Sequence, residues 1–270
     1  MMNKYFLRLS IHLIAYCSIL IGQKIVNMNG TYDLDRDNML EFVALELNPN
    51  KDIFPKLVRY YEIDADGYQT IMWEFIPPVA LEGDFVDAKV GDLNGDGVPE
   101  LVVVMNLTRF GDNNSPHVFI ATYDWDGTHF SEIPSASLDI GKENKSLRCN
   151  NFQLLDQDAD GEQEIVLSLG SPFRGFAIVG SSPSGLSIVK KIRPDQLLVG
   201  SGLLYVAALD YDYDGYDDVV AFSPDGKILK AQPFYNIGGV FDSGHLVKKE
   251  VEGLNGILTH SLELTDWDSD

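Results

Sequence analysis

The stretch GDLNGDGVPELVVV, from Gly91 to Val104, joins an acidic, glycine-containing loop to a run of aliphatic residues. Carboxylate or amide side chains occupy alternate positions of the loop, and the run that follows has the branched residues and the length of a buried β-strand. Three other segments align with it without gaps: YDLDRDNMLEFVAL, LDQDADGEQEIVLS and LDYDYDGYDDVVAF. The chain therefore repeats one structural unit, and that unit determines the fold.

The repeats recur about every 58 residues along the 270-residue chain. Their acidic runs begin at Asp33, Asp92, Asp156 and Asp210, and a further run, DWDSD, begins at Asp266 and is cut off by the chain end. The aliphatic runs after the loops, at residues 101–104, 165–167 and 219–222, favour strands over helices.

Each repeat also carries a turn signal between two alternating segments. These signals lie at residues 64–67, 124–127, 182–185 and 224–226, and three of them contain Asp-Gly. Asp-Gly between alternating segments is typical of a β-hairpin, and we interpret each turn as the outer hairpin of its unit. For the Asp-Gly turns at Asp66, Asp126 and Asp225 we expect a structural role, because they lack the spacing of the acidic loops.

A strand entering the loop, a strand leaving it and an outer hairpin together make four strands, which is the composition of a β-propeller blade. We therefore predict an all-β protein with four-stranded antiparallel blades that begin near residues 24, 84, 148 and 203, and a fifth begun near 260. A ring of seven such blades needs about 400 residues. We expect the chain to be a fragment of such a ring, with pairing of an open edge to another chain as the alternative.

The acidic loops have the chemistry of a calcium site. Oxygen-bearing side chains stand at positions 1, 3, 5 and 9 of each loop, and calcium takes six to eight oxygen ligands, including a main-chain carbonyl at position 7. The candidate ligands are Asp33, Asp35, Asp37 and Glu41; Asp92, Asn94, Asp96 and Glu100; Asp156, Asp158, Asp160 and Glu164; and Asp210, Asp212, Asp214 and Asp218.

Electrostatics supports a cation at these loops. Two like charges about 4 Å apart repel by about 4 kcal/mol at an effective dielectric constant of 20, and each loop gathers three or four carboxylates. The alternative for a single copy is a solvated turn, but four copies in phase with the strand pattern favour metal binding. A helical calcium hand is excluded, because its position 12 requires Glu and is Ala44, Val103, Leu167 or Ala221 here.

Position 6 of each loop must turn sharply with a positive φ angle. Glycine adopts this conformation without steric cost, and asparagine adopts it at a modest cost. Gly97, Gly161 and Gly215 occupy position 6 in three loops, and Asn38 occupies it in the first. We therefore expect the first loop to be intact but slightly compromised.

These loops, above all the one from Gly91 to Val104, resemble the FG-GAP or VCBS repeat of integrin α-chain propeller heads and of many bacterial secreted proteins. The resemblance implies that each loop lies between two strands of a blade and binds calcium through the residues named above. The Phe-Gly and Gly-Ala-Pro signatures of the family are missing, and Met105-Asn106 stands where the second would follow. This departure argues for the broader bacterial repeat rather than for an integrin-like adhesive role.

The amino terminus has the layout of a signal peptide. Lys4 and Arg8 precede an apolar stretch at residues 9–21, which is short for a membrane span of about 20 residues. We predict export with removal of residues 1–22, in preference to a retained anchor, and a periplasmic, cell-surface or secreted location without membrane insertion. Cys149 then remains as the only cysteine, so a disulfide framework is excluded.

The charge of −21 argues against nucleic acid or anionic lipid as a partner, because phosphate binding needs a basic surface. No His-Glu-x-x-His, Gly-x-Ser-x-Gly or phosphate-loop motif is present. Scattered histidines and Cys149 are expected to be packed or surface residues. Aromatic side chains could line a carbohydrate face, but their strand spacing favours blade packing; these are Tyr60, Tyr61, Trp73, Tyr123 and Trp125.

Together these features predict a calcium-binding β-propeller module of an exported protein, without enzymatic activity. It would act as a binding, adhesion or scaffold domain for a protein or polysaccharide partner, through the face opposite the calcium loops. The alternative is the propeller portion of a secreted polysaccharide lyase or hydrolase.

Overall fold

The computed structural model describes residues 25–47, 55–76, 82–108, 117–140, 147–194, 204–225 and 228–250. The regular structure in these ranges consists of 17 β-strands. Across the same ranges, no helix is both long and apolar enough to cross a membrane. The predicted signal peptide at residues 1–22 and the acidic run that begins at Asp266 lie outside the described residues.

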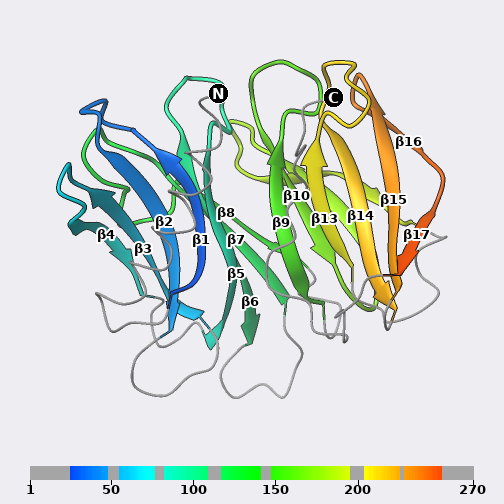
Figure 1. The fold of residues 1–270 in the computed structure, drawn as a ribbon, viewed down its shortest axis with the longest axis horizontal. Helices are drawn as coiled ribbons and strands as arrows, with labels where there is room; N and C mark the ends of the chain where they lie inside the picture. Colours follow the sequence, from blue (N-terminus) through cyan, green and yellow to red (C-terminus); the bar gives the residue numbers. More distant parts are fainter. Residues whose placement is uncertain are drawn as a thin grey trace.

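The strands form four antiparallel sheets, in which strands that follow one another in the chain lie side by side (Figure 1). The first sheet contains β1 (Ile25–Tyr32), β2 (Leu40–Leu47), β3 (Pro55–Ile63) and β4 (Gln69–Phe75). The second contains β5 (Glu82–Gly91), β6 (Glu100–Thr108), β7 (His117–Tyr123) and β8 (Ala136–Ile140). The third contains β9 (Cys149–Leu155), β10 (Glu164–Leu169), β11 (Gly175–Gly180) and β12 (Ser187–Ile192).

The fourth sheet contains β13 (Tyr205–Leu209), β14 (Asp218–Asp225), β15 (Ile228–Ile237) and β16 (Val240–Ser243). A further strand, β17 (Val247–Glu250), pairs with the beginning of β15, whereas β16 pairs with the end of β15. The aliphatic runs predicted as strands lie inside β6, β10 and β14, and each is buried throughout. β6 and β10 are apolar on both faces because the second and third sheets each pack against a neighbouring sheet on either side.

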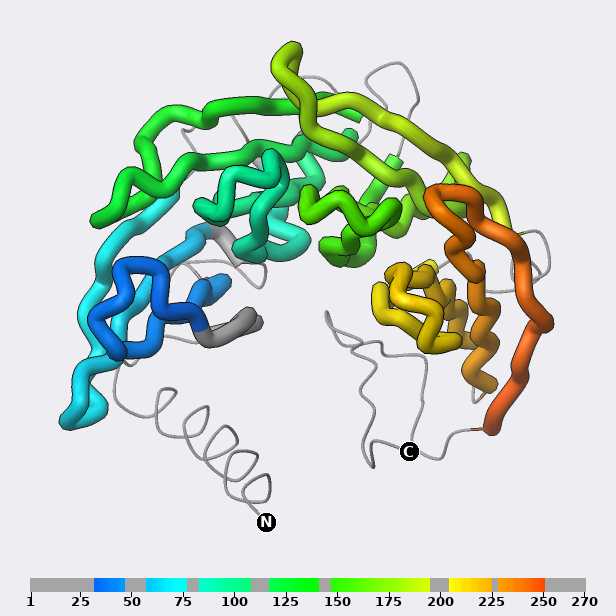
Figure 2. The backbone as a smooth tube through the Cα atoms, turned by 90° about the horizontal axis from the view of Figure 1, so that it is seen from above, coloured from blue at the N-terminus to red at the C-terminus, as the bar shows by residue number. Residues whose placement is uncertain are grey.

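The sheets follow one another along an arc, with the first strand of each on the inner side and the later strands outside (Figure 2). Three apolar clusters fill the spaces between successive sheets. One lies between the first and second sheets and is centred on Val43 and Val103, the next contains Val104 and Ile165, and the last contains Val166. The predicted all-β fold of four-stranded, propeller-type blades is thus confirmed.

Buried asparagines join the sheets across these spaces. The side-chain amide of Asn106 in β6 donates to the Cys149 carbonyl at 2.9 Å and accepts from its N–H at 2.8 Å. Asn151 in β9 makes the same pair of bonds with Val206 in β13, at 2.7 and 3.0 Å. Each amide therefore pairs with the backbone of the first strand of the next sheet, as a neighbouring strand would. It satisfies backbone groups that burial would otherwise leave unpaired.

Four of the five aromatic residues pack between the first two sheets, and Tyr61 packs on Phe42 at the other face of the first sheet, with ring centroids 5.0 Å apart, so the prediction of blade packing is confirmed. Tyr60, Trp73 and Tyr123 are buried, and Trp125 packs on the same cluster. Phe130 lies at the centre of this group, with ring centroids 5.1 Å from Tyr60 and 5.9 Å from Trp73. Edge-to-face contacts of this kind add about 0.5–1.5 kcal/mol each beyond the burial of their surface.

One predicted hairpin has a different place in its sheet. Pro224 and Asp225 of the turn signal at residues 224–226 are the last residues of β14, where Asp225 pairs with Ile228 of β15, so this signal is not at the outer hairpin. The outer turn of the fourth sheet instead lies at Gly238 and Gly239, between β15 and β16. Asp-Gly identifies a tight turn but not which pair of strands it joins, and this made the sequence interpretation wrong. The other three signals lie at outer hairpins, as predicted.

Cys149 and the described histidines have structural surroundings. Cys149 lies at the start of β9, is buried, and has its pKa raised by that burial. His117 Nε2 lies 3.1 Å from Asp139 Oδ1, and His129 Nδ1 lies 3.2 Å from Asp126 Oδ2. The expectation that these residues are packed or surface groups is confirmed for the described positions.

Candidate metal centre

The acidic loops connect the first and second strands of the sheets, and all lie at the upper end of the arc in Figure 1. Hydrogen bonds join neighbouring loops there. The N–H of Gln163 in the third loop donates to the Asp92 carbonyl of the second at 2.8 Å. The Asp217 carboxylate of the fourth loop accepts from the Asp156 N–H of the third at 3.2 Å. The predicted sites therefore form a row along one face.

The carboxylate at position 9 closes each loop in the same way. It stands at or next to the start of the second strand, is buried there, and accepts a hydrogen bond from the N–H at position 2. These bonds join Leu34 to Glu41 at 3.0 Å, Leu93 to Glu100 at 2.8 Å, Gln157 to Glu164 at 3.0 Å and Tyr211 to Asp218 at 3.0 Å.

The aspartates at positions 1 and 5 shape the backbone between these ends. Asp at position 1 accepts from the N–H at position 6 in three loops, as Asp92 does from Gly97 at 2.8 Å. Asp at position 5 accepts from the N–H at position 7 in all four loops, as Asp96 does from Val98 at 2.7 Å. Such side-chain to backbone bonds fold the loop around its own carboxylates.

Two positions of every loop have positive φ angles. Position 6 was predicted to do so and does, with φ of 68° at Asn38, 81° at Gly97, 91° at Gly161 and 93° at Gly215. Position 4 was not predicted, and has φ of 61° at Arg36, 71° at Gly95, 59° at Ala159 and 61° at Tyr213. Left-handed backbone costs about 1–2 kcal/mol in residues with a Cβ. Only Gly95 offered a sequence signal for position 4, and three loops carry this strain.

Carboxylate oxygens converge in three of the loops. In each of these loops, one oxygen from every clustered residue lies within 4.8 Å of the others. The first loop gathers all four predicted residues, and the third and fourth loops gather three each. The clusters are Asp33, Asp35, Asp37 and Glu41; Asp156, Asp158 and Asp160; and Asp210, Asp212 and Asp218.

The second loop has Asn94 at position 3, where each of the three clusters includes an aspartate. Its three carboxylates do not form such a cluster. Asn94 at position 3 donates its amide N–H to Glu100 Oε1 at 2.8 Å, and Leu93 N–H binds the other oxygen. Both oxygens of Glu100 are therefore engaged, and the neutral amide takes the place of one repelling charge.

Burial and mutual repulsion raise the pKa of the position 9 carboxyls. Burial is the largest cause and the charges of the nearby aspartates add to it, so the pKa of Glu41, Glu100 and Glu164 rises to about 7. The backbone N–H at position 2 acts in the opposite direction in each case. The pKa of Asp218 is raised by the same causes. The loops thus hold carboxylates that a positive charge would stabilise in their ionised form.

Tyr60 adds a buried hydroxyl beside the first cluster that the sequence did not reveal. Its side chain is fully buried, and its hydroxyl has no hydrogen-bond partner within the structure as described. Burial raises its pKa, and the charges of Glu41 and Asp35 raise it further. An unpaired hydroxyl next to hard oxygen donors fits a site completed by a cation and its water, because buried polar groups are rarely left unpaired.

The fold and the loops define a repeat protein of β-propeller type with acidic loops along one face. Among protein families, the model of the FG-GAP-like repeat matches residues 33–103, which run from the first loop into β6. The resemblance seen in the sequence is confirmed over these residues. A search of curated protein sequences finds no match.

Solved structures with a similar arrangement include enzymes that act on polysaccharides. The exotype rhamnogalacturonan lyase YesX has 14% identity, a TM-score of 0.45, and coverage of 77% of this chain and 43% of its own. The rhamnogalacturonan lyase from Bacillus licheniformis has 13% identity, a TM-score of 0.43, and coverage of 87% and 54%. The exo-β-1,3-galactanase from Phanerochaete chrysosporium has 10% identity, a TM-score of 0.48, and coverage of 82% and 49%. The chain thus spans about half the length of these proteins.

Proposed function

We propose that the chain is a calcium-binding β-propeller module of an exported protein, which presents a binding surface to a protein or glycan partner. The observation that carries the proposal is the convergence of carboxylate oxygens within 4.8 Å of one another in three loops of the same design. The repetition supports metal binding, because a single acidic cluster can be a solvated turn, whereas three clusters with matching hydrogen bonds indicate the same role in each loop.

Calcium is the metal that suits these donors. The clusters offer hard carboxylate oxygens on a short, flexible loop, and nitrogen or sulfur ligands that would favour zinc are not part of them. Side chains at positions 1, 3, 5 and 9 and the carbonyl at position 7 would hold the ion. Binding should be in the extracellular range of about 10⁻⁴–10⁻³ M.

The position of the loops indicates a structural role for the ion. Each loop connects the inner strand of a sheet to its second strand, and hydrogen bonds join the third loop to the second and to the fourth across the sheet boundaries. An ion that neutralises the carboxylates would stabilise the folded arc, because it binds the native state and not the unfolded chain. The opposite end of the sheets is then free to serve a partner.

Two variants test the metal assignment. Calcium should raise the melting temperature and chelator should lower it, and Asp158→Ala should reduce the number of bound calcium ions by one. Asp66→Ala is the matched control, because Asp66 lies in an exposed hairpin turn outside the loops. Equal calcium stoichiometry in Asp158→Ala and the parent, measured by equilibrium dialysis, would contradict the proposal.

A second pair of measurements tests the binding role. The calcium-loaded protein is screened on a glycan array, and the same polysaccharides are then incubated with it and examined for products. Binding without product formation is the expected result. Product formation that is lost in a heat-denatured control would make the chain an enzyme and overturn this part of the proposal.

A further inference from the structure

A pocket lies between the second and third sheets, at the ends of their strands that are opposite the acidic loops. It has a volume of about 310 Å³. Ile140 at the end of β8, Leu147 before β9 and Leu169 at the end of β10 line it. All three are buried, with at most 4% of their surface exposed. The pocket therefore has three buried aliphatic side chains in its wall.

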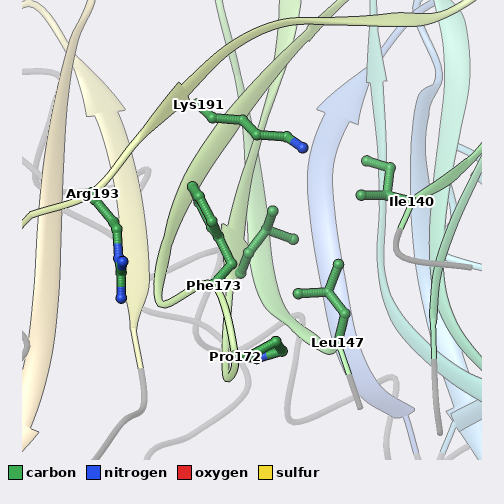
Figure 3. Close-up of a pocket in the computed structure, with 7 residues that line it drawn as sticks. Ile140, Leu147, Pro172, Phe173, Lys191 and Arg193 are labelled. Carbon is green, nitrogen blue, oxygen red and sulfur yellow. The ribbon is translucent and has the colours of Figure 1, made fainter. Parts of the chain in front are cut away.

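Phe173 and two cations complete the pocket. The half-buried ring of Phe173 stands in the connection between β10 and β11, and Lys191 and Arg193 lie at the end of β12. Figure 3 shows Lys191 extending toward Ile140 above Phe173 and Leu147, with Arg193 on the far side of the Phe173 ring. Lys191 lies in β12 and Arg193 is the first residue after it, so both cations stand at the same end of the third sheet.

Among the residues that the structure describes, Lys191 and Arg193 lack the structural contacts that the neighbouring Lys190 makes. Lys190, on the other face of β12, donates to the Gly239 carbonyl at 2.9 Å and covers the Phe241 ring at 5.1 Å. Lys191 and Arg193 are exposed, and within the described ranges neither pairs with a carboxylate. In a chain of net charge −21, two such cations beside an apolar wall form a local site for negative charge.

We propose that this pocket binds a small carboxylate with an apolar body. The body would lie on Leu147, Leu169 and the Phe173 ring, the carboxylate would accept a hydrogen bond from Lys191, and the charge of Arg193 would add to the attraction. The volume is at the lower end of the range for small-molecule sites, which favours a ligand of one ring and a short acid arm. This inference is independent of calcium binding, because the acidic loops lie at the other end of the sheets.

Phenylacetate and its neutral isostere phenylacetamide test the proposal on the full, calcium-loaded chain. A ligand of this size should bind with a dissociation constant on the order of 1 mM. The amide should bind about tenfold more weakly, because it loses charge-assisted hydrogen bonds. Backbone amide shifts in ¹⁵N-labelled protein should change at residues 169–171, at Phe173 and at residues 188–193.

The double variant Lys191→Gln with Arg193→Gln should weaken phenylacetate binding by about tenfold and leave phenylacetamide binding unchanged. The control is Lys248→Gln with Lys249→Gln on the exposed strand β17, which removes the same charge far from the pocket. Equal losses in the two double variants would show long-range attraction only and overturn the proposal. Equal affinity for acid and amide, shifts confined to the acidic loops, or no saturation by phenylacetate would overturn it as well.

Discussion

The first and second acidic loops differ in how many carboxylates they gather and in which residues take the positive φ angles. The first gathers four carboxylates in one cluster but places Arg36 and Asn38 at its two positive φ angles. The second places Gly95 and Gly97 there but does not gather its carboxylates. One loop thus has the charge for a cation on a strained backbone, and the other has a relaxed backbone with less charge. Metal affinity and apo stability should therefore be separable between them.

The hydrogen bonds explain how the second loop holds its shape without an ion. Asp92 accepts from Gly95 and Gly97 at 2.8 Å each, and Asn94 binds Glu100. In the first loop, within the described residues, Asp33 accepts no hydrogen bond, so its carboxylate contributes repulsion and no backbone support. The second loop is organised by its own side chains, and the first depends on an added charge.

The largest expected effect is the loss of calcium stabilisation at the first loop. At free calcium near one hundred times its dissociation constant, a filled site stabilises the fold by about 2.7 kcal/mol. Asp35→Ala should remove most of that increment, because it takes a ligand from the gathered cluster. Asn94→Ala should remove less. The readout is the unfolding free energy with and without chelator, and equal losses would show that the two loops bind calcium alike.

The next largest effect is a loss of stability in the presence of chelator, and here the second loop should be more sensitive than the first. Asp92→Ala should lower the unfolding free energy by about 1–2 kcal/mol, because the backbone N–H groups of Asn94, Gly95 and Gly97 lose their acceptor. Asp33→Ala should leave it unchanged or raise it, since the variant removes a repelling charge and no hydrogen bond. Urea denaturation of both variants at low ionic strength measures the difference. A larger loss in Asp33→Ala would contradict the comparison.

The loops show how far sequence reasoning reached and why. Alternating acids followed by aliphatic runs predicted the loops, the strands after them and the positive φ angle at position 6, because each depends on residues close in sequence. The sequence predicted a four-residue ligand set in every loop, but the structure clusters the whole set only at the first. In the second loop the predicted ligand at position 3 is Asn94, which supplies no carboxylate and whose amide binds Glu100, a contact that the ligand pattern did not predict.

Other features depend on contacts distant in sequence. Asn106 and Asn151 join sheets through backbone groups more than forty residues away, and neither has a local signal. The positive φ angle at position 4 belongs to Arg36, Ala159 and Tyr213, residue types that do not favour it. In the third and fourth loops, the carboxylate at position 1 accepts hydrogen bonds from the backbone N–H groups at positions 5 and 6. These bonds hold the backbone just after position 4.

A single change should convert the second loop toward the first. Asn94→Asp breaks the amide bond to Glu100 and adds a like charge, so it should lower stability in chelator by about 1 kcal/mol. In calcium it adds a ligand charge, so the calcium-dependent gain should become larger than that of the parent. Asn94→Ser is the control, because it breaks the bond without adding charge. If Asn94→Asp were no more calcium-dependent than Asn94→Ser, charge would not be what distinguishes the loops.

The smallest effects concern the backbone at position 6. A Cβ added at Gly97 meets no atom within 4 Å, so Gly97→Ala tests the φ angle of 81° alone and should cost about 1 kcal/mol. Asn38→Gly should gain only about 0.5 kcal/mol, because asparagine already tolerates the left-handed region and glycine adds unfolded-state entropy. Both shifts should persist in chelator and in calcium, because they arise from the backbone. A gain in Asn38→Gly that vanished on calcium removal would mean that the first loop takes this conformation only around an ion.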